Sequence, residues 1–176
     1  IQAVICTEDE HFMTHKGIDP GAIARALLAD LRTRSMAEGG STLTQQLAKN
    51  ELFTQEKHLA RKAAEMLAAF DIEKCYSKQQ IFEMYANTIY FGSGCYGIEE
   101  AAEGYFGKTA ADLTDAEAVL LAGLPNAPST YASNPDLALK RTQTVLKRMV
   151  KCHKLTQEQA DAIAADVQRL QLLNAA

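Results

Sequence analysis

The sequence lacks several features that would assign a protein to a class directly. No apolar run approaches the roughly 20 residues that a membrane-spanning helix needs. The four cysteines stand singly, without the paired spacing of a zinc site or the Cys–His arrangement of a nucleophile. With a formal net charge of −4, the chain also lacks the positive charge typical of nucleic-acid-binding proteins. We therefore expect no nucleic-acid partner. We also expect buried free thiols, with a Cys75–Cys95 disulfide as the alternative.

The sequence also lacks internal repeats, low-complexity segments and long linkers. Its hydrophobic content of 47% and charged content of 23% are typical of a globular domain. We therefore predict a single domain over residues 1–176. Because the first residue is Ile1, we expect the sequence to begin inside a longer product or after processing, with an N-terminal membrane anchor preceding it.

Helix-start signals are frequent. Capping-box sequences at Ser77, Thr114 and Thr156 each precede an apolar periodic run, and Asn134 followed by Pro135 is typical of a helix start. The patterns predict helices over residues 1–11, 21–34, 41–53, 58–76, 77–90, 97–105, 114–123, 135–153 and 156–168. Strand propensity is confined to residues 88–91. The predicted fold class is therefore all-α.

Residues 19–34 form an amphipathic stretch. Its apolar side comprises Ile23, Leu27, Leu28 and Leu31, and its basic residues are Arg25, Arg32 and Arg34. A helix that faces the core and a lobe that rests on lipid both account for this pattern.

Three consecutive acids begin at Glu8. Acidic runs are usually solvated, but acids near a helix C-terminus oppose the helix dipole, so stability does not favour them there. Asp9 belongs to this run, and Phe12, His15 and Gly17 follow where the helical pattern gives way to a loop. The segment is a candidate functional site.

A second candidate site follows Gly39 and Gly40. A helix N-terminus presents free N–H groups, and hydroxyls beside them suit a phosphate or a sugar. The side-chain amides that follow can bind sugar hydroxyls or neighbouring backbone groups. A capped helix alone would account for the two hydroxyl residues, but it would not require the amides, the lysine and the asparagine together. The candidate binding residues are Ser41, Thr42, Gln45, Gln46, Lys49 and Asn50.

A third group consists of Arg61, Lys62 and Glu65. Helical spacing places Arg61 and Glu65 opposite an apolar face. That face comprises Leu59, Ala63, Met66, Leu67 and Phe70. One interpretation is an exposed ion pair that contributes ~0.3–0.5 kcal/mol. The other is a carboxylate flanked by two cations, as a site for a phosphorylated sugar requires.

Two further segments complete the pattern. In the first, Ile81, Phe82 and Tyr85 are predicted to be core residues. Glu83 and Asn87 lie one turn apart, where they would orient other side chains. The second segment, residues 140–148, is a basic helix with either a structural or an anion-binding role.

Together these segments resemble the peptidoglycan glycosyltransferases, family 51 of the glycosyltransferases, which occur as modules of class A penicillin-binding proteins and as monofunctional transglycosylases. The ordered motifs are E-D-x-x-F-x-x-H-x-G at residues 8–17, G-x-S-T-x-x-Q-Q-x-x-K-N at 39–50, R-K-x-x-E at 61–65, I-x-E-x-Y-x-N at 81–87 and a basic segment with V-L at 140–146. The resemblance covers about residues 1–150. It implies a lysozyme-like helical fold, with a larger head lobe and a membrane-facing jaw lobe at roughly residues 17–55.

The resemblance also implies a reaction. Lipid II would be polymerised into β-1,4-linked glycan with inversion at C1 and release of polyprenyl pyrophosphate. Glu8 would be the base for the acceptor hydroxyl, and Lys49, Arg61 and Lys62 would stabilise the leaving pyrophosphate. Glu65 would be a second catalytic carboxylate, which either exchanges a proton, holds the cations or positions a divalent cation such as Mg²⁺ or Mn²⁺. The supporting residues would be Asp9, Phe12, His15, Gly17, Glu83, Tyr85 and Asn87.

The implied partners are lipid II, glycan linked to polyprenyl pyrophosphate, membrane lipid and other cell-wall synthesis proteins. The implied location is the extracytoplasmic face of the bacterial cytoplasmic membrane, and the implied inhibitor is moenomycin. The enzymatic alternative is a lysozyme-like or lytic transglycosylase that cleaves glycan, and the other alternative is an inactive lipid- or glycan-binding relative. Cleavage of a neutral glycan does not require the three cations.

Overall fold

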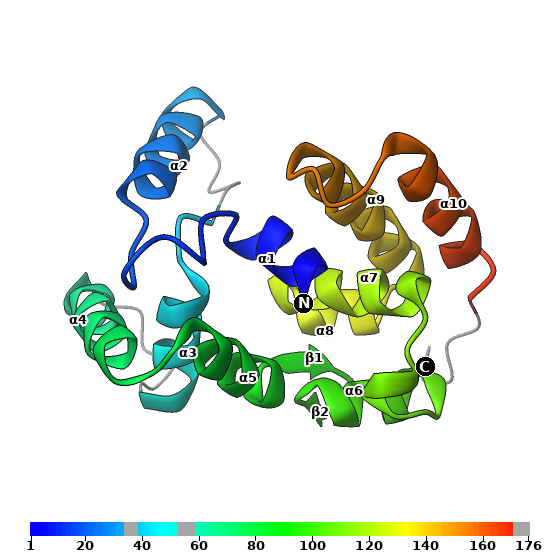
Figure 1. The fold of residues 1–176 in the computed structure, drawn as a ribbon, viewed down its shortest axis with the longest axis horizontal. Coiled ribbons are helices and arrows are strands. Elements are labelled where there is room, and N and C mark those ends of the chain that lie inside the picture. Colours follow the sequence, from blue (N-terminus) through cyan, green and yellow to red (C-terminus); the bar gives the residue numbers. More distant parts are fainter. Residues whose placement is uncertain (34–38, 53–58, 171–176) are drawn as a thin grey trace. The chain divides into compact units, whose positions relative to one another are not determined.

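A computed structural model describes residues 1–33, 39–52 and 59–170 (Figure 1). Its elements are α1 (Gln2–Glu8), α2 (Pro20–Thr33), α3 (Leu43–Leu52), α4 (Leu59–Cys75), α5 (Lys78–Thr88), β1 (Tyr90–Gly92), β2 (Cys95–Tyr96), α6 (Ile98–Phe106), η1 (Ala110–Asp112), α7 (Asp115–Gly123), η2 (Leu124–Asn126), α8 (Pro128–Ala132), α9 (Pro135–Lys151) and α10 (Gln157–Val167). The predicted all-α class is confirmed. In the described ranges, no helix combines the length and the apolarity needed to cross a membrane.

The chain divides into two compact units. Unit 1 comprises residues 1–10 and 86–176, and unit 2 comprises residues 11–85. Unit 2 contains the range predicted to be the jaw lobe, of which residues 34–38 and 53–55 lie outside the described residues. It also contains α4 and most of α5.

In unit 1, α1, α7, α9 and α10 pack against one another (Figure 1). The apolar positions of α9 recur at helical spacing, so one side of this long helix is buried. The buried residues of the shared cluster are Ala3, Cys6, Val119, Ala122, Val145, Leu146, Met149 and Ala160. This cluster fixes α1 against α9, which positions the acidic run at the end of α1.

The predicted helix starts are confirmed at atomic detail. Thr114 and Thr156 each form a complete capping box with the residue three positions later. Ser77 exchanges the same pair of contacts with Gln80 at the start of α5. The Asn134 side chain accepts a hydrogen bond from the Leu137 N–H, with Pro135 in the first turn.

The small elements between residues 89 and 132 were only partly predicted. The strand propensity of residues 88–91 appears as β1, which pairs with β2 in an antiparallel hairpin. Gly92 adopts a φ of +91°, and a Cβ there would lie 2.6 Å from the Pro128 carbonyl oxygen. The short helices η1, η2 and α8 were not predicted, because three to five residues are too few to establish a helical period.

The predicted helix over residues 1–11 is too long. The helix α1 ends at Glu8, and Asp9 leaves the helical region with φ −158° and ψ 76°. Consecutive acids interact unfavourably with the negative end of the helix dipole, which opposes continuation of the helix. The acids therefore lie at the helix end and in the turn that follows it.

The apolar faces of α2 and α4 differ from core faces, which for α2 was one of the two interpretations of the sequence. On α2, Leu27 and Leu28 are 60% and 56% exposed, so they do not face a core. The Leu31 and Arg32 side chains and Arg34 lie outside the described residues. On α4, Leu67 is 66% exposed, whereas Glu65 is 1% exposed. The ion pair of α4 is therefore not a surface pair, because the helix is rotated so that its acid faces inward.

Candidate functional site

Glu8 lies at the last residue of α1 and is held from α9. Its Oε1 lies 3.3 Å from Arg141 Nη2, and the two side chains are 12% and 16% exposed. A largely desolvated ion pair of this kind fixes the direction of the carboxylate more firmly than a surface pair does. The structure thus presents Glu8 as an oriented and still accessible acid.

Two further cations of α9 stabilise the same end of α1. Arg148 Nη1 donates to the Thr7 carbonyl oxygen at 3.0 Å, which satisfies one of the free carbonyls of the helix C-terminus. Lys151 Nζ lies 2.9 Å from Glu10 Oε2. The unfavourable position of the acids is therefore offset by α9. Sequence reasoning identified α9 as basic but not its partners, which lie more than 130 residues away.

Glu65 is the most deeply buried of the predicted site acids. Its Oε1 lies 3.0 Å from Arg61 Nε, and its Oε2 lies 3.0 Å from Lys62 Nζ. A carboxylate that is 1% exposed is costly unless it is paired, so these two cations offset the cost of burying Glu65.

Lys62 connects the second and third predicted motifs. Its Nζ also donates to Ser41 Oγ at 2.8 Å, while the Lys62 side chain remains 45% exposed. Ser41 lies two residues before the N-terminus of α3, where the helix dipole favours an anion. An exposed ammonium group beside such an N-terminus can bind a phosphate.

Thr42 and Gln45 are partners in a capping box. Thr42 Oγ1 accepts from the Gln45 N–H at 3.1 Å, and Gln45 Oε1 accepts from the Thr42 N–H at 2.9 Å. Thr42 Oγ1 also donates to the Gly17 carbonyl oxygen at 2.6 Å. These predicted binding residues therefore shape the start of α3. The Gln45 Nε2 is buried without a hydrogen-bond partner among the described residues.

Gly17 occupies a position that only glycine can take. Its φ is +98°, and a Cβ there would lie 2.9 Å from both the carbonyl carbon and the carbonyl oxygen of Ala69. The loop after α1 thus lies directly against the α4 backbone. This close approach holds the Gly17 carbonyl oxygen in place to accept the hydrogen bond from Thr42 Oγ1.

A buried polar network in unit 2 was not predicted. Glu73 Oε1 accepts from both Lys78 Nζ and Thr44 Oγ1 at 2.6 Å. His15 Nδ1 lies 3.5 Å from Lys78 Nζ and accepts from the Gly17 N–H at 3.1 Å. The network fixes the loop that carries the first motif. No local signal distinguishes Glu73 from an ordinary surface acid, so the sequence alone does not reveal it.

The aromatic residues of the motifs belong to the same unit. Phe12 is fully buried, and Lys78 Nζ lies 4.5 Å from the centroid of its ring. Tyr85 is also buried, and its hydroxyl lies 3.4 Å from Gln46 Oε1. The predicted core role of Tyr85 and Ile81 is confirmed, whereas Phe82 is only half-buried.

The remaining predicted residues lie at the surface or in the other unit. Lys49, Asn50 and Glu83 are exposed in unit 2. Asp9 is buried in unit 1. Asn87 is exposed in unit 1. Its backbone lies so close to Gly97 that no larger residue than glycine fits at position 97. Unit 1 therefore holds Glu8, Asp9 and Asn87, and unit 2 holds the other predicted residues.

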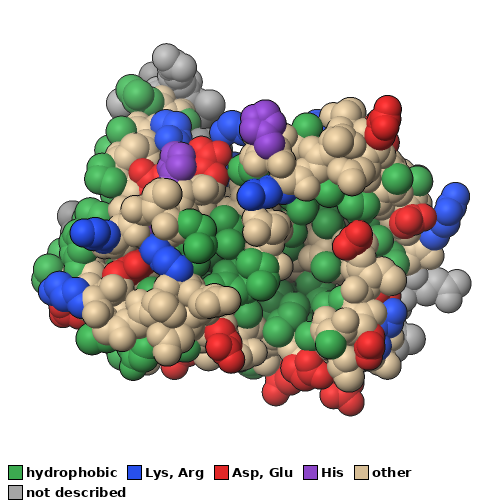
Figure 2. Space-filling model, in the orientation of Figure 1, with side chains coloured by type: hydrophobic (Ala, Val, Ile, Leu, Met, Phe, Trp, Pro, Cys, Tyr) green, Lys and Arg blue, Asp and Glu red, His purple; other side chains and the backbone are tan. Residues whose placement is uncertain are grey.

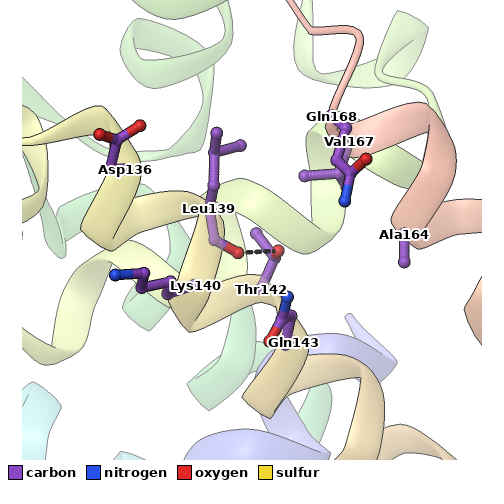
Figure 3. Close-up of a pocket in the computed structure, with 8 residues that line it drawn as sticks. All are labelled: Asp136, Leu139, Lys140, Thr142, Gln143, Ala164, Val167 and Gln168. Carbon is purple, nitrogen blue, oxygen red and sulfur yellow. Dashed lines mark hydrogen bonds between the residues drawn. The ribbon is translucent and has the colours of Figure 1, made fainter.

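A cavity of ≈ 270 Å³ lies between α9 and α10 in unit 1 (Figure 3). The hydroxyl group that lines this cavity already donates a hydrogen bond, from Thr142 Oγ1 to the Leu139 carbonyl oxygen at 2.6 Å. The lining residues are Asp136, Leu139, Lys140, Thr142, Gln143, Ala164, Val167 and Gln168. Three of them, Lys140, Thr142 and Gln143, belong to the predicted basic segment, but none is a predicted catalytic or substrate-binding residue, so this cavity does not mark the predicted catalytic site.

The residues around Glu65 do not fit a divalent cation. Such an ion prefers several oxygen ligands, whereas both oxygens of Glu65 are already paired with cations. Within the ranges that the structure describes, no group of three or more His, Cys, Asp or Glu side chains is arranged to hold a metal. The pairing around Glu65 thus favours a role in holding the two cations over a role in metal binding.

Comparison with known proteins shows the family of the chain. The transglycosylase family model matches residues 1–150. Penicillin-binding protein 1A from Aquifex aeolicus is 49% identical over 161 residues, which cover 90% of this chain and 22% of that protein. The corresponding protein from Vibrio cholerae is 45% identical, over 94% of this chain and 20% of its own.

Two other relatives extend the comparison. Penicillin-binding protein 2D from Bacillus subtilis is 42% identical, over 99% of this chain and 26% of its own. The crystal structure of penicillin-binding protein 1A from Haemophilus influenzae aligns with 69% of this chain and 15% of its own, at 31% identity and a TM-score of 0.46. The chain thus spans about a fifth to a quarter of the length of the Aquifex, Vibrio and Bacillus proteins.

Proposed function

Because the chain belongs to the transglycosylase family, we propose that it is a peptidoglycan glycosyltransferase that polymerises lipid II into β-1,4-linked glycan. The observation that carries this proposal is the buried Glu65, paired with Arg61 and with a Lys62 that also reaches Ser41. A site with this composition suits a substrate that carries phosphate, which a finished glycan does not.

Unit 2 would bind the donor. The pyrophosphate would lie at the N-terminus of α3, where the positive end of the helix dipole and the Lys62 ammonium attract an anion. Glu65 would hold both cations in place instead of exchanging a proton, because each of its oxygens is already paired. Lys49 and Asn50 lie exposed on α3 and would contact the same ligand.

Glu8 would be the base. The 4-hydroxyl of the acceptor sugar attacks C1 of the donor opposite the departing phosphate, so the new C1–O bond forms as the old one breaks. Glu8 takes the hydroxyl proton, and polyprenyl pyrophosphate leaves with the electron pair of the broken bond. Arg141 orients Glu8 for this transfer. Inversion at C1 follows from attack at the opposite face.

The first prediction tests this role of Glu8. The substitution Glu8→Gln preserves the shape and the contact with Arg141 but removes the proton acceptor, so polymerisation of labelled lipid II should fall by about 10²–10⁴-fold. The matched control is Glu10→Gln, which alters the neighbouring acid of the same turn and should retain at least half of the activity. Gel separation of the labelled glycan gives the rates.

Two outcomes would contradict the proposal. If the folded parent protein cleaves finished peptidoglycan and forms no polymer from lipid II, the protein is a lytic enzyme. If Glu8→Gln is as active as the parent, Glu8 is not the base. Inhibition of the parent by moenomycin would provide a second readout of the donor site.

The exposed leucines of unit 2 support a membrane-facing role for this unit. Leu27 and Leu28 on α2 and Leu67 on α4 are each more than half exposed, and apolar side chains appear over these helices in Figure 2. We propose that these side chains contact lipid at the extracytoplasmic face of the bacterial cytoplasmic membrane, where lipid II and other cell-wall synthesis proteins would be met.

The second prediction concerns these leucines. The double substitution Leu27→Ser and Leu28→Ser removes exposed apolar area without opening a core, so binding to anionic phospholipid vesicles should weaken by about tenfold while the unfolding midpoint stays unchanged. The control is Leu137→Ser in unit 1, at a side chain that is 39% exposed. Equal vesicle binding by the double variant and the parent would refute the proposed lipid contact.

A further inference from the structure

Two cysteines of unit 1 meet at the interface of α1 and α9. Cys6 is 2% exposed within the shared apolar cluster, and Cys152, at the C-cap of α9, packs against the same cluster. The Cys152 thiol lies close enough to the Cys6 thiol to contribute to its raised pKa. Both are free thiols, and the remaining two, Cys75 and Cys95, belong to different units.

The backbone on both sides of this pair is fixed. The Lys154 N–H donates to the Met149 carbonyl oxygen and the His153 N–H donates to the Val150 carbonyl oxygen, each at 2.9 Å. His153 has a φ of +55°, so these bonds form a Schellman cap directly after Cys152. On the α1 side, the helical hydrogen bond from the Asp9 N–H to the Ile5 carbonyl oxygen encloses Cys6.

Polar contacts hold α1 and α9 together around the two thiols. Arg148, four residues before Cys152, donates to the Thr7 carbonyl oxygen at 3.0 Å. Lys151, directly before Cys152, lies 2.9 Å from Glu10. Each contact joins a neighbour of one cysteine to a neighbour of the other. The relative position of the two helices, and hence of the two sulfur atoms, is therefore constrained.

We propose that Cys6 and Cys152 are a disulfide-forming pair that covalently fastens the end of α1, two residues before Glu8, to the end of α9. The oxidant is an external disulfide, either of a small thiol or of an oxidoreductase. The Cys152 thiolate attacks this disulfide and releases one external thiol. The Cys6 thiolate then attacks Cys152 Sγ and releases the second, so two electrons pass to the external disulfide and the two cysteine protons end on the two released thiols.

The environment of each thiol sets the order of these steps. Cys152 is partly exposed, so an external disulfide reaches it first. Burial, together with the neighbouring Cys152 thiol, raises the pKa of Cys6 to about 12, so closure is slow at neutral pH and accelerates as the pH rises. An extracytoplasmic location would favour the oxidised form. This last point rests on the proposed function, whereas the pairing of the thiols does not.

The test uses the whole chain and oxidised glutathione. After incubation at pH 8.5, the remaining thiols are alkylated, and a tryptic digest is analysed without reduction. We expect a linked species of peptides 1–16 and 152–154, with Cys75 and Cys95 not joined to either peptide. We also expect the thermal unfolding midpoint to rise by roughly 5 °C or more, because a loop that spans most of the chain is closed.

Two variants keep the test independent of folding and of activity. Cys152→Ser should lose both the linked species and the rise in the midpoint, and Cys75→Ser should retain both. Dithiothreitol should reverse both effects in the parent. If Cys152 is recovered only as its glutathione adduct after prolonged incubation at pH 9, the pair does not close and the proposal is overturned. Lipid II polymerisation by the reduced protein tests the proposed function separately.

Discussion

At the scale of single residues, the candidate site contains charges that are paired but not all buried. Glu65 is 1% exposed, whereas the Lys62 side chain that neutralises it is 45% exposed. A fully enclosed ion pair would serve the fold alone. The exposed ammonium group retains bonding capacity toward solvent, so a bound phosphate can share it with the carboxylate.

The third prediction concerns this lysine. Lys62→Gln removes the positive charge that the leaving pyrophosphate requires, so kcat/KM for lipid II should fall by about 10–100-fold. Lys74→Gln is the matched control, because Lys74 is paired with Asp71 on the same helix but is fully accessible. That variant should polymerise lipid II at the parental rate. Similar losses in the two variants would show that the effect reflects overall charge rather than the site.

At the scale of elements, capping residues determine where the helices begin. In the box before α7, Glu117 accepts from the Thr114 N–H at 2.8 Å and lies 2.9 Å from Lys108 Nζ. Burial alone would raise the pKa of Glu117, but the hydrogen bonds from Thr114 and Lys108 outweigh it and hold this pKa below the usual 4.5. The box before α10 has Gln159 in the same position and does not titrate.

The fourth prediction follows from this pKa. A carboxyl group whose folded pKa is lowered stabilises the fold fully above pH 4.5, and this contribution is lost as the pH falls through the folded pKa. Glu117→Gln should therefore lower the free energy of unfolding by about 1–2 kcal/mol at pH 7. The difference from the parent should shrink as the pH falls below 4.5.

Denaturant titrations between pH 3 and pH 7 measure this difference. Gln159→Ala is the control. Because Gln159 does not titrate, this substitution should lower the free energy of unfolding by the same amount at each pH. If the difference in free energy of unfolding between Glu117→Gln and the parent is also constant from pH 7 to pH 3, the charge of the Glu117 carboxylate does not stabilise the fold.

At the scale of the whole molecule, the two units differ in the kind of side chains that they bury. Unit 1 is organised around an apolar cluster, whereas unit 2 contains a buried polar network of Glu73, Lys78, His15 and Thr44. Such a network stabilises only when every partner is present, because a single unpaired buried charge is costly. Local opening should therefore differ between the units.

The fifth prediction uses this difference. Lys78→Met leaves the Glu73 carboxylate buried without its cation, which should cost about 3–5 kcal/mol in unit 2. Amide hydrogen exchange should become faster throughout residues 11–85, while the protection of α9 and α7 stays near the parental level. Lys74→Gln again provides the exposed control. Uniformly faster exchange in both units would show that the molecule opens as one cooperative unit.

The sequence by itself determined the class, the helix starts and the family. Capping boxes at Thr114 and Thr156 are local signals, because the interacting groups lie within one turn of each other. The ordered motifs are likewise readable without a structure, and the family they indicate is shown by the comparisons. All of these features depend on residue types at short, fixed spacings.

Only the tertiary structure decided which charges are buried and what holds them. The spacing of α4 placed Glu65 opposite the apolar face, yet Glu65 is buried and Leu67 exposed, because packing against the rest of unit 2 sets the rotation of the helix. The partner of Glu8 is Arg141, at a separation of 133 residues, which no local pattern encodes. Burial and pairing are properties of distant contacts, so they follow from the fold and not from the spacing of residues along the chain.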